Sequence, residues 1–277
     1  MTLKQDGKIM TDKVWILGPC CMEDWDLYSS TAEKLIDIMG DRNWYYKASF
    51  DKANRTAYSG GRGPGFKEGL NLIEKLKNKH PNIKLTTDVH ETNQVEPVSA
   101  LIDVVQIPAF LCRQTDLLYT SAAFFDIVNI KKGQWINPDS AKHMVGKVKH
   151  TNPNVKVWLT ERGTQFGYSQ LIVDFGAVDE IKPHFDRIIL DCTHSTQRKK
   201  GDFTGGDREL AERYFLASSI FGYNGIFAEV HPYPPSSVSD ADCQIYLDKV
   251  QKLIVAHDEI EKLLLEFGDE GDSSSTG

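Results

Sequence analysis

The sequence predicts an α/β protein with a single-domain (β/α)8 barrel, the TIM-barrel fold. Its 277 residues include 40% hydrophobic side chains, enough to bury a sizeable core. Eight short runs rich in β-branched and aromatic residues alternate with helical patterns along the chain. Eight such units close a barrel, whereas a doubly wound sheet favours about five to seven strands and a glycine fingerprint after the first one. The first strand is followed by "GPC", which is not that fingerprint.

The elements follow in a regular order. Expected strands occupy 14–18, 44–50, 83–89, 103–109, 127–131, 155–160, 187–193 and 225–231. Helical periodicity is clearest at 25–39, 65–80, 115–125, 207–223 and 243–267. No linker rich in Pro, Gly or Ser divides the chain into two domains. We therefore assign residues 1–267 to one catalytic barrel and expect the polar segment 268–277 to be a disordered tail.

Composition excludes several functional classes. A formal charge of −7 disfavours a nucleic-acid surface, and no apolar run reaches the length of a membrane span. The first thirteen residues lack the apolar centre of a signal peptide, so we expect a soluble cytoplasmic protein with neither nucleic-acid nor membrane partners. Five cysteines without paired spacing indicate reduced thiols instead of a disulfide framework.

Polar side chains collect where the expected strands end. In a barrel these ends and the loops after them share one face, which is where catalytic residues lie. Cations predominate from the second strand to the sixth, which suggests a ligand with phosphate and carboxylate groups. Surface salt bridges are the competing interpretation. In chain order the set is Cys20, Lys47, Lys52, Asn54, Arg55, Asp88, His90, Gln106, Arg113, Lys131, Lys132, Glu161, Arg162, Asp191, His194, Glu229 and His231.

The first, seventh and eighth strands suggest a second subsite. Cys20, His194 and Glu229, with a carboxylate just beyond Glu229, would form a mixed sulfur, nitrogen and oxygen site for a divalent metal. Each residue alone also has a structural interpretation: a buried thiol, a hydrogen-bonded histidine or an ion-paired acid. Cys21 is expected to be a small packed residue.

At these positions the chain resembles the 3-deoxy-D-manno-octulosonate 8-phosphate synthase family. The resemblance covers nearly the whole chain. It is carried by "LGPC", "KASFDKANR", "TTDVHE", "QIPAFLCRQTDL", "VNIKKGQ", "LTERGTQFGY", "LDCTHSTQ", "GGDRE", "EVHPYP" and "VSDADCQIYL", in this order. It implies a (β/α)8 barrel that condenses phosphoenolpyruvate with D-arabinose 5-phosphate and releases inorganic phosphate, a transferase step of lipopolysaccharide biosynthesis.

The resemblance also implies a metal site, since metal-dependent members of this family carry cysteine in "GPC". One divalent ion per subunit, Zn²⁺, Fe²⁺, Mn²⁺ or Co²⁺, would be held by Cys20, His194, Glu229 and Asp240. The implied catalytic set is Lys47, Lys52, Asn54, Cys20, His194 and Asp240.

Two groups of substrate contacts follow from the same resemblance. Phosphoenolpyruvate would contact Lys47, Lys52, Lys131 and Arg162, with Gln106 nearby, and the sugar phosphate would face Asn54, Arg55 and Thr56. Asp88 joins the substrate-binding set. Arg113 matches a residue that reaches a phosphate across a subunit interface, which implies a homotetramer.

The chain departs from the family in one loop. It reads "TAYSGGRGPG" where members usually have Ser-Ser after "KANR", so Thr56 replaces a serine and Gly60 and Gly61 enter the loop. Two alternatives stay open. One is the sister enzyme that uses erythrose 4-phosphate, although it typically has Lys-Pro-Arg where this chain has "KANR". The other is a non-catalytic metal-binding barrel.

Overall fold

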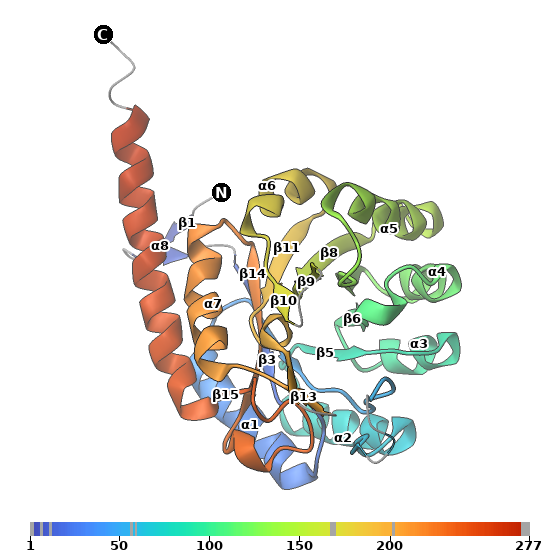
Figure 1. Cartoon of the computed structure of the whole chain (residues 1–277). Helices are drawn as coiled ribbons and strands as arrows, with labels where there is room; N and C mark the ends of the chain where they lie inside the picture. The colour runs from blue at the N-terminus through green and yellow to red at the C-terminus, as the bar shows by residue number, and fades with distance from the viewer. Residues whose placement is uncertain are drawn as a thin grey trace.

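A closed barrel of eight parallel strands forms the centre of the molecule (Figure 1). The computed structural model describes residues 3–5, 8–10, 13–55, 58, 60–166, 170–200 and 203–272. Neighbouring strands pair in chain order, and the last pairs with both the seventh and the first, which closes the ring and confirms the predicted fold. The barrel strands are β3 (Val14–Gly18), β4 (Trp44–Lys47), β5 (Leu85–Asp88), β6 (Val104–Ile107), β7 (Ile127–Lys131), β8 (Lys156–Glu161), β11 (Arg187–Asp191) and β14 (Gly225–His231).

Helices surround the barrel on its outer face (Figure 1). Three of them begin at a side chain that accepts a hydrogen bond from the first turn: Asp24, Asn137 and Asp207. Such caps satisfy backbone N–H groups that have no partner within the helix. The helices are α1 (Trp25–Met39), α2 (Phe66–Lys79), α3 (Thr92–Ser99), α4 (Thr115–Phe124), α5 (Pro138–Thr151), α6 (Val178–Ile181), α7 (Arg208–Ile220) and α8 (Val250–Asp272).

The helix predicted at 243–267 is wrong in its first seven residues. Ile245–Tyr246 instead forms β15, which pairs in parallel with the end of β14, and the α-helix starts only at Val250. Backbone groups at the end of β14 offer hydrogen bonds that periodicity in the sequence does not reveal. The same helix continues to Asp272, five residues into segment 268–277, and residues 273–277 lie outside the described part of the chain.

Short strands and turns connect or extend the barrel elements. Three two-stranded antiparallel sheets are formed by β1 (Leu3–Gln5) with β2 (Lys8–Met10), β9 (Thr164–Gln165) with β10 (Leu171–Ile172), and β12 (Arg198–Lys200) with β13 (Phe203–Gly205). Single 3₁₀ turns occupy Ala109–Leu111, Phe175–Ala177, Lys182–His184, His194–Thr196, Pro234–Ser236 and Leu247–Lys249. The turns at 109–111 and 194–196 follow β6 and β11, so they belong to the face where the strands end.

The apolar core has two layers. The larger layer lies between strands and helices, and a smaller cluster fills the barrel interior with Val14, Ile16, Tyr45, Val104, Trp158, Ile189 and Phe227. Phe227 is the upper surface of this inner cluster, because the ammonium nitrogen of Lys131 lies 3.2 Å from its ring centroid. Apolar side chains therefore fill the barrel interior up to Phe227, and polar groups lie beyond it, toward the carboxyl ends of the strands. A reaction can take place only at that end.

All five cysteines are buried, and none forms a disulfide. Cys21 packs against Gly63, whose φ of +95° favours glycine; a Cβ there would lie 2.4 Å from the Cys21 sulfur. Among the described residues, no helix combines the length and apolar character needed to cross a membrane.

Candidate functional site

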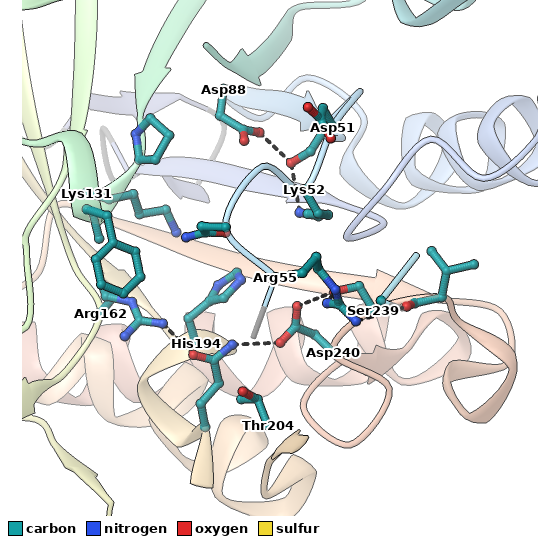
Figure 2. A pocket seen from close by; sticks show the side chains of 18 of the residues that line it. Asp51, Lys52, Arg55, Asp88, Lys131, Arg162, His194, Thr204, Ser239 and Asp240 are labelled. Carbon is teal, nitrogen blue, oxygen red and sulfur yellow. Dashed lines mark hydrogen bonds between the residues drawn. The ribbon is translucent and has the colours of Figure 1, made fainter. Parts of the chain in front are cut away.

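A cavity of about 640 Å³ opens at the carboxyl ends of the barrel strands (Figure 2). This volume lies within the range of small-molecule sites, about 300–1,000 Å³. Its lining is rich in charge, which differs from the mainly apolar walls of a typical ligand pocket. The charged and imidazole side chains that line it are Lys47, Asp51, Lys52, Arg55, Asp88, His90, Lys131, Arg162, His194, Asp240 and Asp242.

Two lysines share one carboxylate on the floor of this cavity. The ammonium nitrogen of Lys47 lies 3.1 Å from Glu229 Oε1, and that of Lys52 lies 3.9 Å from the same atom. Burial alone would raise the pKa of Glu229, but His194, Lys47 and Lys52 together hold it below its usual range. One carboxylate therefore pairs with both ammonium groups.

Lys131 and Arg162 extend the cationic wall. Lys131 forms an ion pair with the buried Asp191, and burial lowers the pKa of the lysine to about 8. Arg162 is buried, and its Nη2 donates to the amide oxygen of Gln197 at 2.6 Å. Its Nη1 has no hydrogen-bond partner among the described residues. A buried guanidinium nitrogen without a partner is costly, so this atom is ready to bind an anion.

A hydrogen-bonded group on β5 borders the same cavity. Asp88 accepts hydrogen bonds from the Ser49 hydroxyl and pairs with His90 Nε2 at 3.1 Å. Ser49 also accepts from Lys52 at 2.8 Å, so the carboxylate positions a lysine through the hydroxyl. The amide oxygen of Gln106 is buried and has no hydrogen-bond partner among the described residues. This leaves an acceptor for a ligand beside the cations.

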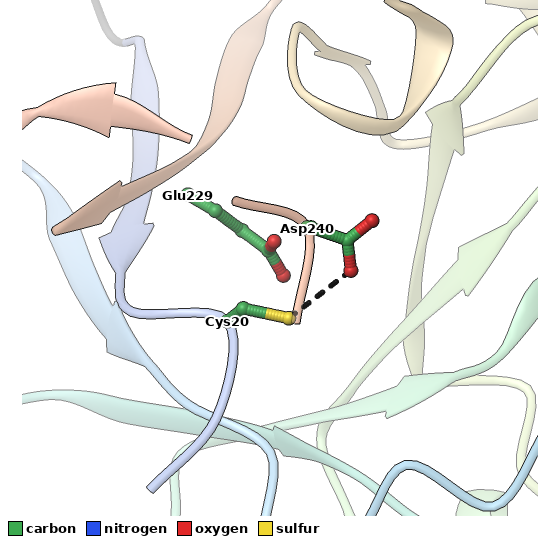
Figure 3. A group of neighbouring side chains, drawn as sticks. All are labelled: Cys20, Glu229 and Asp240. Atoms are coloured by element: carbon green, nitrogen blue, oxygen red, sulfur yellow. Dashed lines mark hydrogen bonds between the residues drawn. The ribbon is translucent and has the colours of Figure 1, made fainter. Parts of the chain in front are cut away.

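Cys20, Glu229 and Asp240 bring their ligand atoms together at the back of the cavity (Figure 3). Their sulfur and oxygen atoms all lie within 4.8 Å of one another, and the Cys20 sulfur is 3.3 Å from Asp240 Oδ2. Burial, followed by the charge of Glu229, raises the pKa of the Cys20 thiol. Glu229 Oε2 is buried and has no partner among the described residues. A thiol and two carboxylates with an unsatisfied oxygen fit a divalent cation. The positive charge of that cation would stabilise the thiolate and so oppose the rise in the pKa of Cys20 that burial causes.

His194 lies beside this cluster but outside the 4.8 Å group. Its Nδ1 is 2.9 Å from Asp191 Oδ2, and its Nε2 is 3.5 Å from Glu229 Oε1. The Asp191 carboxylate orients the ring so that Nε2 faces Glu229. An imidazole held by a carboxylate in this way is the usual arrangement of a metal-ligating histidine.

The loop after β14 holds Asp240 in an uncommon backbone conformation. Its φ is +53°, and within the described chain it is the one residue other than glycine with positive φ. Burial alone would raise its pKa, but His194, Lys52 and hydrogen bonds from Gln197 and Ser239 hold it below the usual range. An ionised carboxylate is therefore held in place at a local conformational cost, as is frequent at functional sites.

Comparison with known proteins assigns the chain to a family. The model of the DAHP synthetase I family matches residues 2–266. The chain belongs to this family. It is 40% identical over 256 residues to the 2-dehydro-3-deoxyphosphooctonate aldolase of Fusobacterium nucleatum, which covers 91% of each chain. It is 38% identical over 271 residues to the protein of that name from Campylobacter jejuni, with 93% of this chain and 99% of that protein covered. The Geobacter protein of the same name is 40% identical over 243 residues, 86% of this chain and 88% of its own length.

Most residues predicted for the site of this DAHP synthetase I family member line its cavity. They are Lys47, Lys52, Asn54, Arg55, Asp88, Gln106, Lys131, Arg162, His194 and Asp240. Cys20 and Glu229 lie buried beneath them. Thr56 lies outside the described residues. Arg113 is exposed and does not line the cavity of its own chain.

Four other residues noted at strand ends do not line the cavity: Lys132, Glu161, Asp191 and His231. Lys132 and Glu161 form a buried pair, with 3.2 Å between Lys132 Nζ and Glu161 Oε2, and Lys132 donates to the carbonyl of Ile136. Side chains alternate along a strand, so the residue after an inward-facing one points away from the barrel axis. These charges hold loops in place.

Gln197, Ser49 and Ser239 are parts of the site that sequence reasoning missed. Gln197 donates to Asp240 Oδ1 at 2.7 Å and accepts from Arg162, and the Ser239 hydroxyl donates to Asp240 Oδ2 at 2.8 Å. Each is an uncharged residue inside a motif that was noted only for its charged members. Their position directly beside those members was the available signal.

Proposed function

We propose that this chain condenses phosphoenolpyruvate with D-arabinose 5-phosphate to give 3-deoxy-D-manno-octulosonate 8-phosphate and inorganic phosphate. The observation that carries the proposal is a cavity in which buried cations with spare binding capacity adjoin a cluster of sulfur and oxygen ligands. The name of these relatives describes an aldolase of an eight-carbon sugar acid. Such a product requires the three carbons of phosphoenolpyruvate and a five-carbon aldose phosphate.

Phosphoenolpyruvate binds to the cationic wall in this proposal. Lys47, Lys52, Lys131 and Arg162 neutralise its phosphate and carboxylate, and Gln106 lies beside them in the cavity wall. The gathering of Lys47, Lys52 and Lys131 on one wall and the unpartnered Arg162 Nη1 support this assignment. Oriented cations in a water-poor site stabilise developing charge better than water does.

The sugar phosphate occupies the mouth of the cavity, beside Asn54 and Arg55. We also assign Thr56 to the group that binds it. Arg55 donates to the Ser239 hydroxyl, so its guanidinium lies next to the Asp240 loop (Figure 2). A phosphate bound there directs the aldehyde end of the sugar toward the ligand cluster. Holding two anionic substrates in line is a large part of the rate enhancement.

One divalent ion completes the site in this proposal. Cys20, Glu229 and Asp240 would hold it, with His194 as the fourth ligand, and it would supply a Lewis acid for an aldehyde or a bound water.

The chemical step forms one carbon–carbon bond. The C3 atom of phosphoenolpyruvate attacks the aldehyde carbon while water adds at C2, and the phosphate then leaves with its ester oxygen. Lys47 and Lys131 stay close to the charge that moves toward the departing phosphate. Addition of water releases one proton, and the new alkoxide takes one up. As the phosphate leaves, the C2 hydroxyl loses its proton to form the ketone, and the phosphate takes one up.

Parallel assays with two aldose phosphates test this proposal. We expect metal-supplemented protein to release phosphate from phosphoenolpyruvate with arabinose 5-phosphate at least tenfold faster than with erythrose 4-phosphate, roughly the discrimination that one mismatched group in a site provides. Lys131→Met provides the background rate. Preference for the four-carbon sugar would overturn the substrate assignment. Phosphate release that never exceeds background would identify a non-catalytic barrel.

Metal dependence needs its own measurement. Metal analysis of freshly purified protein, followed by chelation and add-back of Zn²⁺, Fe²⁺, Mn²⁺ and Co²⁺, should show loss and recovery of activity. Undiminished turnover in excess chelator, with no metal detected, would remove the ion from the proposal.

A homotetramer is also part of the proposal, with Arg113 binding a phosphate in the cavity of a neighbouring subunit. Arg113 is exposed, and the nearby Phe110 and Trp135 are 57% and 52% exposed with ring centroids 5.8 Å apart. An aromatic pair at the surface is typical of a subunit interface. Light scattering should give four chains per particle, and Arg113→Ala should raise KM for the sugar phosphate without changing that number. A monomer of full activity would contradict this assignment.

A further inference from the structure

Gln197 joins the two halves of the site through one side chain. Its amide oxygen accepts from Arg162 Nη2 at 2.6 Å, and its amide nitrogen donates to Asp240 Oδ1 at 2.7 Å. Figure 2 shows Arg162 and Asp240 on either side of this connection, next to His194. Arg162 belongs to the cationic wall and Asp240 to the ligand cluster.

We propose that Gln197 couples these halves, so that a divalent cation at Cys20, Glu229 and Asp240 sets the position of Arg162 and thereby the affinity for phosphoenolpyruvate. The inference rests on the proposed function, since it needs both ligands. In this role Gln197 is a positioning residue: it acts through Arg162 and Asp240.

The chemistry of the two partners fixes the orientation of the amide. A guanidinium only donates hydrogen bonds and a carboxylate only accepts them, so a flipped amide would face like groups at both ends. Both bonds involve a charged partner and are of the stronger kind. A displacement of Asp240 therefore reaches Arg162 through two directional contacts.

The two partners also differ in how firmly other residues hold them. Asp240 Oδ2 has its own contacts, with the Ser239 hydroxyl at 2.8 Å and the Cys20 sulfur at 3.3 Å. Arg162 is buried, and its Nη1 has no hydrogen-bond partner among the described residues. The guanidinium is therefore the member that responds when Asp240 is fixed by a cation.

Sequence position adds a further constraint. Gln197 directly follows the 3₁₀ turn His194–Thr196, and its backbone N–H donates to the carbonyl of His194 at 3.3 Å. His194 is in turn oriented by Asp191, the partner of Lys131. One short turn thus carries a proposed metal ligand and the residue that contacts the phosphoenolpyruvate side.

Linkage makes the proposal measurable without turnover. If a cation changes the affinity for phosphoenolpyruvate by some factor, phosphoenolpyruvate changes the cation's affinity by the same factor, and such factors are about 5 to 150. We would titrate phosphoenolpyruvate by calorimetry into metal-free and Mn²⁺-loaded protein, and titrate Mn²⁺ with and without phosphoenolpyruvate. The two titrations must give the same coupling factor.

Gln197→Met keeps the length of the side chain and removes both hydrogen bonds. We expect its coupling factor to be at least about fivefold smaller than in the wild type, the low end of typical coupling. Ser239→Ala is the matched control, because it removes a hydrogen bond to Asp240 that does not lead to Arg162. It should weaken Mn²⁺ binding but keep the coupling factor within about twofold. Gln197→Asn, too short to span both partners, should repeat the loss if the methionine variant folds poorly.

The outcomes separate the two proposals. Wild-type protein that binds neither phosphoenolpyruvate nor Mn²⁺ would refute the proposed function and this inference with it. Wild-type protein that binds both without coupling would refute the inference alone. An equal loss of coupling in Gln197→Met and Ser239→Ala would show that Asp240 acts without this connection.

Discussion

Both ends of the barrel bury a lysine, and they satisfy its charge differently. At the amino end, Lys13 just before β3 forms an ion pair with Glu261 of α8 and contacts His257 at 3.4 Å. At the carboxyl end, Lys47 and Lys52 share the single carboxylate of Glu229.

The difference separates structural charge from functional charge. A buried ion with a partner of its own contributes to the fold, whereas buried ions with too few partners leave attraction for a ligand. At the carboxyl end, Arg162 Nη1, Gln106 Oε1 and Glu229 Oε2 are unpartnered among the described residues, and at the amino end the unpartnered atom beside Lys13 is His257 Nδ1. Three variants and one change of pH distinguish these two kinds of buried charge.

The largest effect is expected for Cys20→Ala. Losing the thiolate should abolish stoichiometric metal binding and lower kcat/KM by about a thousandfold or more, since Lewis-acid stabilisation provides several kcal/mol. The unfolding transition in urea should stay cooperative. Metal analysis and steady-state kinetics measure both; wild-type activity of this variant in chelator would remove Cys20 from the site.

Arg162→Met tests the cationic wall. We expect kcat/KM to fall by roughly 100- to 1,000-fold, as when a preorganised donor is removed from an active site. The free energy of unfolding should be unchanged or higher, because the lost guanidinium has an unsatisfied buried nitrogen. Urea denaturation measures this free energy. A decrease as large as that expected for breaking a buried ion pair would contradict the distinction between the two ends.

Lys13→Met is the reciprocal test at the amino end. Removing one partner of a buried pair should lower the free energy of unfolding by about 3 kcal/mol, because Glu261 then carries an uncompensated charge. The double variant with Glu261→Leu should recover most of this loss. Both proteins should keep wild-type kcat/KM where they are folded, and a large fall in activity would mean that the two ends are not separate.

The smallest effect concerns pH. Burial lowers the pKa of Lys131 to about 8, with Asp191 opposing this shift and Lys47 adding to it. The ammonium form that binds an anion therefore prevails below pH 8 and is lost above it. KM for phosphoenolpyruvate should rise by up to about tenfold per pH unit above 8. In Lys131→Arg, KM for phosphoenolpyruvate should stay constant between pH 7 and 9.5, because arginine stays protonated there. A KM that still rises with pH would mean that a group other than Lys131 titrates.

Much of the fold could be read from local patterns. All eight barrel strands and the helix at 25–39 lie where periodicity places them, since apolar spacing and capping act within a few residues. The segment 243–249 was misassigned, because its strand β15 depends on a partner, β14, that is only nearby in space. The family resemblance selected most of the strand-end residues that line the cavity, whereas periodicity alone did not separate Lys131 from Lys132.

The order of the strands and of the residues at their ends is a property of the chain alone, so the sequence predicts an eight-strand barrel with cations, a thiol and acids at one end. The pairing of Lys132 with Glu161, away from the cavity that Lys131 lines, is visible only in the folded chain. The same holds for the contacts of Gln197 with Arg162 and Asp240. These arrangements depend on which way side chains point and on contacts between distant segments, and such contacts exist only once the ring of strands has closed.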